Sequence, residues 1–286
     1  APLPEIPENY RTWLSEHCAY MEIDKLRGKS EVIQVKLPEI FVPLFADDLG
    51  KKAGSGRNGG ETVRPVNIET LIKEKDFLLI EGHPGSGKTT LLNHLAYSVV
   101  QIPTQAKGFD GWLPILLFLK DLKGFFAGQT GITPSPSTAE KILAFYCDMT
   151  GSGLSLEMIN AFCKGKKTLF LLDGLDEIEE SQRNVVVHSF ADFRTQNGGN
   201  KLVLSGRPHG AAGAAADRFG TNHVKILSLN SDQTETFIRN WFRYVYAEDS
   251  RIGSKTAAGM ISEIQAHPSI GQLIDNPLML TAICIL

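Results

Sequence analysis

The sequence predicts an α/β fold in which helices cover both faces of a parallel sheet. Five apolar runs have the length and composition of strands: 77–80, 114–119, 168–172, 201–204 and 224–229. Helix-like stretches lie between them, at 88–101, 138–163 and 180–196. Strands that alternate with helices are typical of a parallel sheet, because each crossover must return the chain to the same edge. The runs 116–119 and 169–172 are continuously apolar, as expected of central strands buried on both faces.

The segment before this core is expected to form a lead-in of one helix and extended structure. Within residues 10–27, apolar side chains recur at near-helical spacing: Trp13, Leu14, Cys18, Met21 and Leu26. Residues 31–45 alternate in polarity and contain two prolines, which favours extended structure at an edge. Residues 50–60 contain five glycines among polar neighbours and predict a flexible linker or a disordered loop.

Residues beyond 230 are predicted to form a helical domain. Two rows of large apolar side chains follow helical spacing: Phe237, Trp241 and Val245, then Ile238, Phe242 and Tyr246. Ser231 or Asp232 would cap this helix. We therefore expect a lead-in at 1–63, an α/β domain at 64–230 and an incomplete helical domain at 231–286. Because the chain stops inside an apolar run, we expect it to be a piece of a larger protein.

Composition and charge are those of an ordinary globular protein. Of 286 residues, 42% are hydrophobic and 21% are charged, and the net charge of −3 argues against a dedicated nucleic-acid binder. The four cysteines are scattered, which predicts reduced, buried thiols rather than a zinc site. The sequence shows neither an apolar run long enough to span a membrane nor a signal peptide. We expect a cytoplasmic protein without direct membrane or nucleic-acid binding.

A glycine-rich motif follows the first core strand. Residues 82–89 match the pattern G-x-x-x-x-G-K-[ST] between a strand-like run and helix-like sequence, which is the context the motif requires. Its glycines let backbone N–H groups turn toward an anion, and the helix N-terminus adds positive charge. Lys88 can reach the β- and γ-phosphates of a nucleotide, and the Thr89 hydroxyl can bind Mg²⁺. The candidate phosphate-binding residues are Gly82, His83, Pro84, Gly85, Ser86, Gly87, Lys88, Thr89 and Thr90.

An acidic group after a later strand is the expected partner of this loop. Asp173 directly follows the apolar run 168–172, where a carboxylate can hold Mg²⁺ directly or through water. Asp176 and Glu177 come next, and a carboxylate there can orient or deprotonate an attacking water. We favour Asp176 for this role and keep Glu177 as the alternative.

A third polar strand end completes the expected site. The run 201–204 leads into Ser205 and Arg207. In P-loop ATPases that activate water, a strand lies between the one carrying the loop and the one carrying the acid, so that its tip faces the γ-phosphate. Ser205 and Arg207 would then sense this phosphate, and Arg207 could neutralise developing charge. The alternative for Arg207 is an ordinary surface arginine.

Together these motifs resemble the NACHT family of STAND P-loop NTPases. The family couples a loop of the type GxxGxGKTTLL with an apolar strand ending in D-G-L-D-E, and both patterns occur here, at 82–92 and 173–177. The tip at 205–208 is similar to the family's sensor-1 element, often Thr-Ser-Arg-Pro, with Ser205 and Gly206 in place of Thr-Ser. The resemblance implies an ASCE-type three-layer fold with a lead-in and a following helical domain.

The resemblance also implies contacts to the base of ATP or ADP. Residues 276–278 look like the family's Asn-Pro-Leu step, whose proline packs near adenine, which makes Pro277 a candidate. Residues 37–44 resemble the lead-in of prokaryotic members, which runs beside the base, so Val42 is a second candidate.

For function, the resemblance implies a switch that holds ADP at rest, takes up ATP after a trigger and oligomerises to activate an effector. Many prokaryotic members act in defence against phage. The trigger-sensing, winged-helix and effector parts are expected outside this chain, homo-oligomers are expected of the activated full-length protein, and hydrolysis is expected to be slow.

Three other functions stay open on the sequence. A motor-type P-loop ATPase that remodels protein or nucleic acid would show steady, partner-stimulated turnover instead of trapped ADP. A small-molecule kinase is disfavoured, because acids that activate water at Asp176 and Glu177 would compete with transfer to its acceptor. A nucleotide-binding scaffold without catalysis is disfavoured by the same pair.

Overall fold

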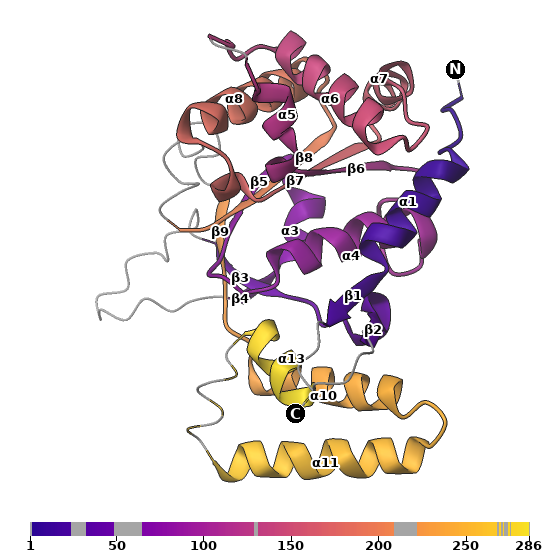
Figure 1. The fold of residues 1–286 in the computed structure, drawn as a ribbon, viewed down its shortest axis with the longest axis vertical. Helices are drawn as coiled ribbons and strands as arrows, with labels where there is room; N and C mark the ends of the chain where they lie inside the picture. The colour runs from indigo at the N-terminus through magenta and orange to yellow at the C-terminus, as the bar shows by residue number, and fades with distance from the viewer. Residues whose placement is uncertain are drawn as a thin grey trace.

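The computed structural model describes residues 2–23, 33–48, 65–128, 131–208, 222–267, 269, 271, 274 and 276–285. In this part of the chain, a seven-stranded sheet has the order β4-β3-β9-β5-β8-β7-β6 (Figure 1). Its parallel strands are β5 (Phe77–Glu81), β6 (Leu113–Phe118), β7 (Thr168–Asp173), β8 (Lys201–Gly206) and β9 (His223–Ile226). The five expected strands are confirmed, and β8 lies between β5 and β7.

Two antiparallel strands extend the sheet at one edge. β3 (Phe45–Asp48) pairs with β9, and β4 (Pro65–Asn67) pairs with β3. The extended structure expected at 31–45 is found in β2 (Ile33–Lys36) and at the start of β3. Between them lies a helical turn, α2 (Leu37–Ile40). Pro38 is compatible with it because it stands in the first turn, where its missing N–H breaks no helical hydrogen bond.

Helices cover both faces of the sheet (Figure 1). On one face lie α1 (Glu8–Cys18), α3 (Ile68–Glu74) and α4 (Lys88–Gln101). On the other lie α5 (Lys123–Phe126), α6 (Pro136–Thr150), α7 (Leu156–Lys164) and α8 (Glu180–Gln196). Two short 3-10 turns follow strand ends, η1 (Leu119–Leu122) after β6 and η2 (Leu175–Glu177) after β7. Of the two runs expected to be central strands, 169–172 lies in β7, which is central and buried, whereas 116–119 lies at the end of β6, which is an edge strand of the sheet.

The single helix expected at 138–163 is wrong, because two helices occupy this stretch. Gly151 ends α6 in the left-handed conformation, with φ of 56°. Ser155 then starts α7, where its Oγ accepts a hydrogen bond from the Met158 N–H at 3.2 Å. The glycine that ends α6 and the serine that begins α7 interrupt the helix, although apolar side chains keep helical spacing across the turn.

The helix expected at 10–27 is also wrong beyond Cys18. The chain turns at Ala19 into β1 (Tyr20–Ile23), which pairs antiparallel with β2, and Met21 lies opposite Val35. Ladder hydrogen bonds to a distant segment override the local spacing of apolar residues here. Leu26 and the glycine-rich stretch 50–60 lie outside the described residues.

The C-terminal region is helical, as expected. α10 (Ser231–Val245), α11 (Ser250–Ala266) and α13 (Pro277–Ile285) form a second hydrophobic core with residues of the lead-in. Both predicted rows of α10 are buried in their first two members, whereas Val245 and Tyr246 are 47% and 36% exposed. None of the described helices is long and apolar enough to cross a membrane.

The predicted cap of α10 is wrong by one residue. Asn230 is the N-cap, and its Oδ1 accepts from the Gln233 N–H at 2.9 Å. The Gln233 side chain returns the bond, since its Oε1 accepts from the Asn230 N–H at 3.0 Å. This reciprocal pair satisfies two donors at the helix start, which a cap at Ser231 or Asp232 would leave open.

Candidate functional site

The loop between β5 and α4 is shaped as an anion cradle. Gly85 and Gly87 have φ of 78° and 90°, which disfavour any side chain. A Cβ at Gly82 would clash with Ser86 Oγ, and one at Gly87 would lie 3.2 Å from Leu44. Gly87 is the N-cap of α4 and brings no capping side chain, so the first N–H groups of the helix stay available to a ligand.

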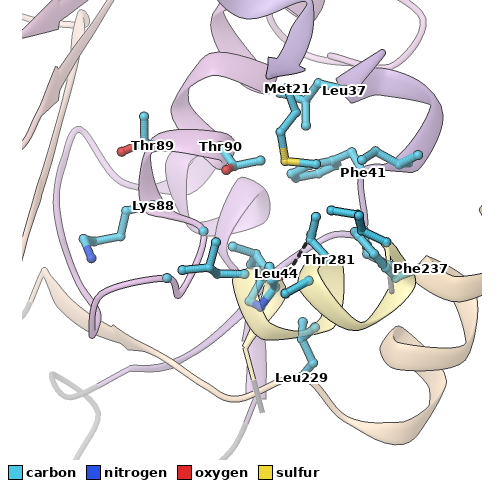
Figure 2. Close-up of a pocket in the computed structure, with 18 residues that line it drawn as sticks. Met21, Leu37, Phe41, Leu44, Lys88, Thr89, Thr90, Leu229, Phe237 and Thr281 are labelled. Atoms are coloured by element: carbon cyan, nitrogen blue, oxygen red, sulfur yellow. Dashed lines mark hydrogen bonds between the residues drawn. The ribbon is translucent and has the colours of Figure 1, made fainter. Parts of the chain in front are cut away.

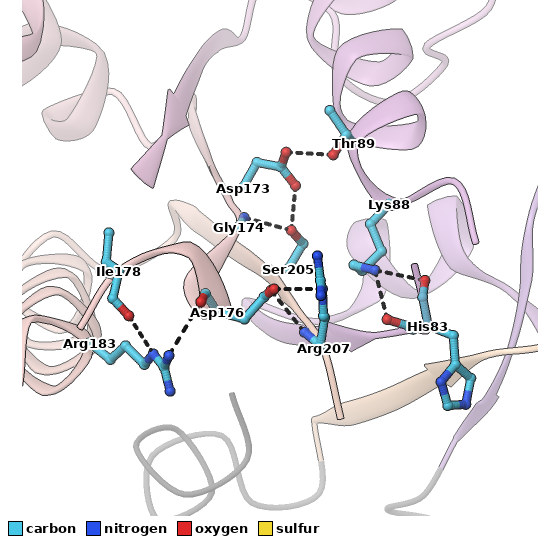
Figure 3. A network of polar contacts seen from close by, with 11 residues as sticks. His83, Lys88, Thr89, Asp173, Gly174, Asp176, Ile178, Arg183, Ser205 and Arg207 are labelled. Carbon is cyan, nitrogen blue, oxygen red and sulfur yellow. Dashed lines mark hydrogen bonds and ion pairs between the residues drawn. The ribbon is translucent and has the colours of Figure 1, made fainter. Parts of the chain in front are cut away.

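The side chain of Lys88 bends back over this loop (Figure 3). Its Nζ donates to the main-chain oxygens of Gly82 at 2.7 Å and His83 at 3.1 Å. Burial lowers the pKa of Lys88, and the negative charges of Asp176 and Asp173 oppose this shift. The amine therefore lies at the loop and within the field of both carboxylates.

Asp173 connects the loop to the sheet. Thr89 Oγ1 donates to Asp173 Oδ2 at 2.7 Å, across 84 residues of sequence. Ser205 Oγ, at the tip of β8, donates to Asp173 Oδ1 and accepts from the Gly174 N–H at 3.0 Å. Asp173 is 7% exposed and Ser205 is fully buried. The start of α4 and the ends of β7 and β8 thus meet at the Asp173 carboxylate (Figure 3).

The acidic pair follows Asp173 in the turn η2. Gly174 starts the turn with φ of 83°. The Asp176 carboxylate accepts from Arg207, whose Nε lies 2.8 Å from Oδ2 and whose main-chain N–H lies 3.0 Å from Oδ1. The Glu177 side chain is exposed. The two candidate acids are therefore in different states, one paired and one open to solvent.

A cavity of about 380 Å³ adjoins the phosphate loop (Figure 2). Its walls are mostly apolar and come from β1, α2 and the segment after it, α4, α10 and α13. Val42 and Pro277, the two predicted base contacts, both line it together with Gly85 and Gly87. Such a cavity beside a phosphate cradle has room for a flat, apolar-faced base.

The start of α13 packs directly on the loop. A Cβ at Gly85 would lie 3.0 Å from Leu278 Cβ and 3.1 Å from Asn276 Oδ1. The Leu278 N–H donates to the Gly85 oxygen at 3.4 Å, and Asn276 Oδ1 accepts from the Met279 N–H at 3.0 Å. The Asn-Pro-Leu step therefore forms the start of this helix and one wall of the cavity.

The structure brings the predicted residues of the loop together, with one difference in detail. Thr90 lines the cavity, as do Gly85, Gly87, Lys88 and Thr89 of the same loop and helix start. Pro84 and His83 are exposed, and the His83 ring points away from Lys88, so only its main chain takes part in the contacts of the loop (Figure 3).

Several residues of the site are not predicted by the sequence. Met21, Phe41, Phe237 and Thr281 line the cavity (Figure 2). Helical spacing predicts Phe237 as helix core and Met21 as part of a longer helix, because such spacing marks burial and does not tell a core from a cavity wall. Arg183 also escapes prediction, since its contacts to the acidic turn leave no motif in the sequence.

The residues present fit a nucleotide and Mg²⁺. Ser86 Oγ is buried in the loop without a hydrogen-bond partner, as a donor awaiting a ligand oxygen would be. The described residues contain no cluster of three or more His, Cys, Asp or Glu suited to a metal. Thr89 and Asp173 place two side-chain oxygens side by side, which would suit Mg²⁺, because this ion completes its shell with phosphate oxygens and water.

Comparison with known proteins identifies the family. The family model described as NACHT domain matches residues 76–244, more than half of the chain. No curated protein matches. Solved structures with distant similarity include the Thermotoga maritima RuvB Holliday junction branch migration motor, at 12% identity and a TM-score of 0.36, with 77% of this chain and 67% of that one covered.

Two others are C. elegans PCH-2, at 13% identity and a TM-score of 0.36, and the replication initiator DnaA bound to AMPPCP and single-stranded DNA, at 14% identity and a TM-score of 0.32. The similarity covers 63% of this chain and 45% of PCH-2, and 69% of this chain and 59% of DnaA. The family match spans the phosphate loop, the acidic turn and the tip of β8. The chain therefore belongs to the NACHT family of NTPases.

Proposed function

We propose that this NTPase is an ATP/ADP switch that binds Mg²⁺ and hydrolyses ATP slowly. The observation that carries the proposal is the contact between Thr89 and Asp173, at 2.7 Å, beside the Lys88 amine and next to an apolar cavity. This contact brings together a loop suited to phosphates, two oxygen atoms suited to a metal ion and a cavity suited to a base. Each part by itself has other uses, whereas their combination matches a nucleoside triphosphate.

Each residue then has a defined role. The N–H groups of the loop and the Lys88 amine would hold the phosphates. Thr89 and Asp173 would hold Mg²⁺, which balances phosphate charge when bound. Ser205 would orient Asp173, and Arg207 would meet the γ-phosphate. Val42 and Pro277 would contact the base, and Asp176 or Glu177 would activate the water.

The origin of the cavity walls supports a switch over a motor. Its walls come from the lead-in, the sheet domain and α13, so a bound base would be covered by segments far apart in the sequence. We expect these segments to pack around a bound base, which would slow its exchange. Slow exchange suits a protein that holds ADP at rest, whereas a motor must release ADP in every cycle.

The remaining parts of the proposal concern the full-length protein. Exchange of ADP for ATP would drive homo-oligomerisation and activate an effector outside this chain, in cytoplasmic innate immune or anti-phage signalling. This part rests on the family. The full-length protein is expected to purify with about one ADP per chain, and a nucleotide-free preparation with fast steady turnover would instead indicate a motor.

Replacement of Lys88 tests the site itself. Lys88→Ala is expected to weaken ATP and ADP binding by about tenfold to a hundredfold, because it removes a charged donor from the phosphates. The matched control is Lys164→Ala on the exposed end of α7. Titration calorimetry measures both, and equal affinities in the two variants would refute phosphate binding at this loop.

A further inference from the structure

Both carboxylate oxygens of Asp176 are already engaged (Figure 3). Arg207 contacts Oδ2 through Nε at 2.8 Å and donates its main-chain N–H to Oδ1 at 3.0 Å. The Asp176 side chain is 13% exposed, whereas that of Arg207 is 56% exposed. A water molecule activated by Asp176 would have to displace one of these contacts, and the arginine is the partner with room to leave.

The main chain of the acidic turn is held in place from α8. Arg183 donates through Nε to the Ile178 oxygen at 2.9 Å and through Nη2 to the Asp176 oxygen at 3.3 Å. The Gly174 N–H is held by Ser205. Because the turn is fixed at both ends, the Asp176 carboxylate has little freedom to move with Arg207.

Glu177 differs from Asp176 in its contacts. Its side chain is exposed, and its carboxylate forms no hydrogen bond or ion pair with the described residues. It lies against Gly174, since a Cβ there would come within 3.0 Å of Glu177 Cδ and 3.1 Å of Oε2. The Glu177 carboxylate therefore lies against Gly174, the residue that follows Asp173, and is not engaged by a side chain of the described residues.

We propose that Asp176 is a positioning residue that holds Arg207 until a γ-phosphate competes for it, and that Glu177 is the acid that activates water. This inference rests on the proposed function. In the reaction Glu177 accepts a proton from the water whose oxygen attacks the γ-phosphorus, and the bond to the bridging oxygen breaks with its electron pair leaving on ADP. ADP cannot compete for Arg207, so the pair Asp176–Arg207 lowers the affinity for ATP alone.

The test compares affinities for ADP and for a non-hydrolysable ATP analogue, measured on the same chain with Mg²⁺. Asp176→Asn is expected to raise affinity for the analogue by about fivefold and to leave ADP affinity unchanged, because a part-exposed ion pair no longer holds Arg207. Arg207→Gln is expected to lower the ratio of analogue affinity to ADP affinity. In the double variant Asp176→Asn with Arg207→Gln, this ratio is expected to be the same as in Arg207→Gln alone.

Single-turnover hydrolysis separates the two acids. Glu177→Gln is expected to keep analogue affinity and to slow hydrolysis by about a hundredfold or more, the usual effect of removing a general base. Asp176→Asn is expected to slow it less. Equal loss of hydrolysis in both variants, with an unchanged affinity ratio in Asp176→Asn, would overturn the inference.

Two further outcomes are distinct. If Asp176→Asn does not fold, Arg207→Gln carries the test, and an unchanged affinity ratio in that variant overturns the inference. If the unaltered chain binds neither nucleotide, the proposed function itself fails. If it binds both nucleotides but neither Asp176→Asn nor Arg207→Gln changes the affinity ratio, the inference is overturned while nucleotide binding at the site stands.

Discussion

At the scale of single residues, the site depends on a few buried polar groups that satisfy one another. Ser205 accepts from the Gly174 N–H and donates to Asp173, which in turn accepts from Thr89. A buried donor or acceptor without a partner costs about 1–3 kcal/mol, so the bonds of the buried Ser205 are needed for stability as well as for position.

Ser205→Ala is therefore expected to destabilise the protein by about 1–3 kcal/mol, because it leaves the Gly174 N–H unpaired in the interior. Urea unfolding measures this change. The exposed Ser181 on α8 provides the control, since Ser181→Ala is expected to stay within about 0.5 kcal/mol of the unaltered protein. Equal stabilities of the two variants would contradict the bond network.

His94 gives the fold a dependence on pH. Its ring lies in α4, is 6% exposed and stacks on Phe41 with centroids 3.7 Å apart. Burial lowers the pKa of His94 to about 4, whereas the unfolded chain binds this proton near its ordinary value of about 6.5. The contribution of His94 to the free energy of unfolding is therefore fully present above the pKa of the unfolded chain, and it is lost as the pH drops from about 6.5 to about 4.

Between pH 7 and pH 5 we expect the unaltered protein to lose about 2 kcal/mol of unfolding free energy that the variant His94→Phe does not lose. Phenylalanine keeps the stack on Phe41 and does not titrate. Urea unfolding at both values of pH measures the difference, with His267→Gln on an exposed surface as control. A pH dependence that is the same in His94→Phe would show that His94 does not titrate between them.

At the scale of elements, local capping bonds explain where a helix begins, and tertiary contacts explain how it is joined to the rest of the molecule. The capping box of Asn230 and Gln233 starts α10, and Gln233 Nε2 also donates to the Pro43 oxygen at 2.7 Å. One side chain thereby both starts the helix and joins it to the lead-in, next to the cavity wall at Val42.

Asn230→Ala is expected to lower stability by about 1 kcal/mol, because the α10 start loses its acceptor. Ser231→Ala is the matched control, since this serine is one of the two caps that the sequence suggested and the structure does not use. Thermal or urea unfolding of both variants measures the effect. A larger loss in Ser231→Ala would restore the original assignment of the cap.

At the scale of the whole molecule, the cavity beside the phosphate loop lies where three regions meet. Residues 37–44, the phosphate loop and α13 all contribute walls, and the second hydrophobic core joins lead-in residues such as Val35 and Ile40 to α10 and α13. A ligand that fills the cavity contacts all three regions and links their local stabilities.

We therefore expect ADP to slow amide hydrogen exchange in 37–44, in the phosphate loop and in α13 together. α7, which lines no part of the cavity, serves as the internal reference. Exchange followed by mass spectrometry, with and without saturating ADP, measures this pattern. Protection confined to the phosphate loop would show that the lead-in and α13 do not close over the nucleotide.

Much of the architecture could be predicted from the chain before its structure. The five core strands, the order that places β8 between β5 and β7, and the meeting of Lys88, Asp173 and Ser205 were all expected. Runs of apolar residues and a glycine-rich loop depend on local chemistry, so they can be recognised in the sequence alone. The helix limits at Cys18 and Gly151 failed, since apolar spacing continues through both of these turns.

By itself the sequence determined the α/β class, the phosphate loop and the acids that face it, because backbone geometry restricts these positions to a few residue types. Only the tertiary structure decided that Asp176 is paired with Arg207 while Glu177 is open, and which distant side chains enclose the cavity. Those outcomes depend on atoms brought together across many residues of chain, and no local preference of Asp176, Met21 or Phe237 encodes such a meeting.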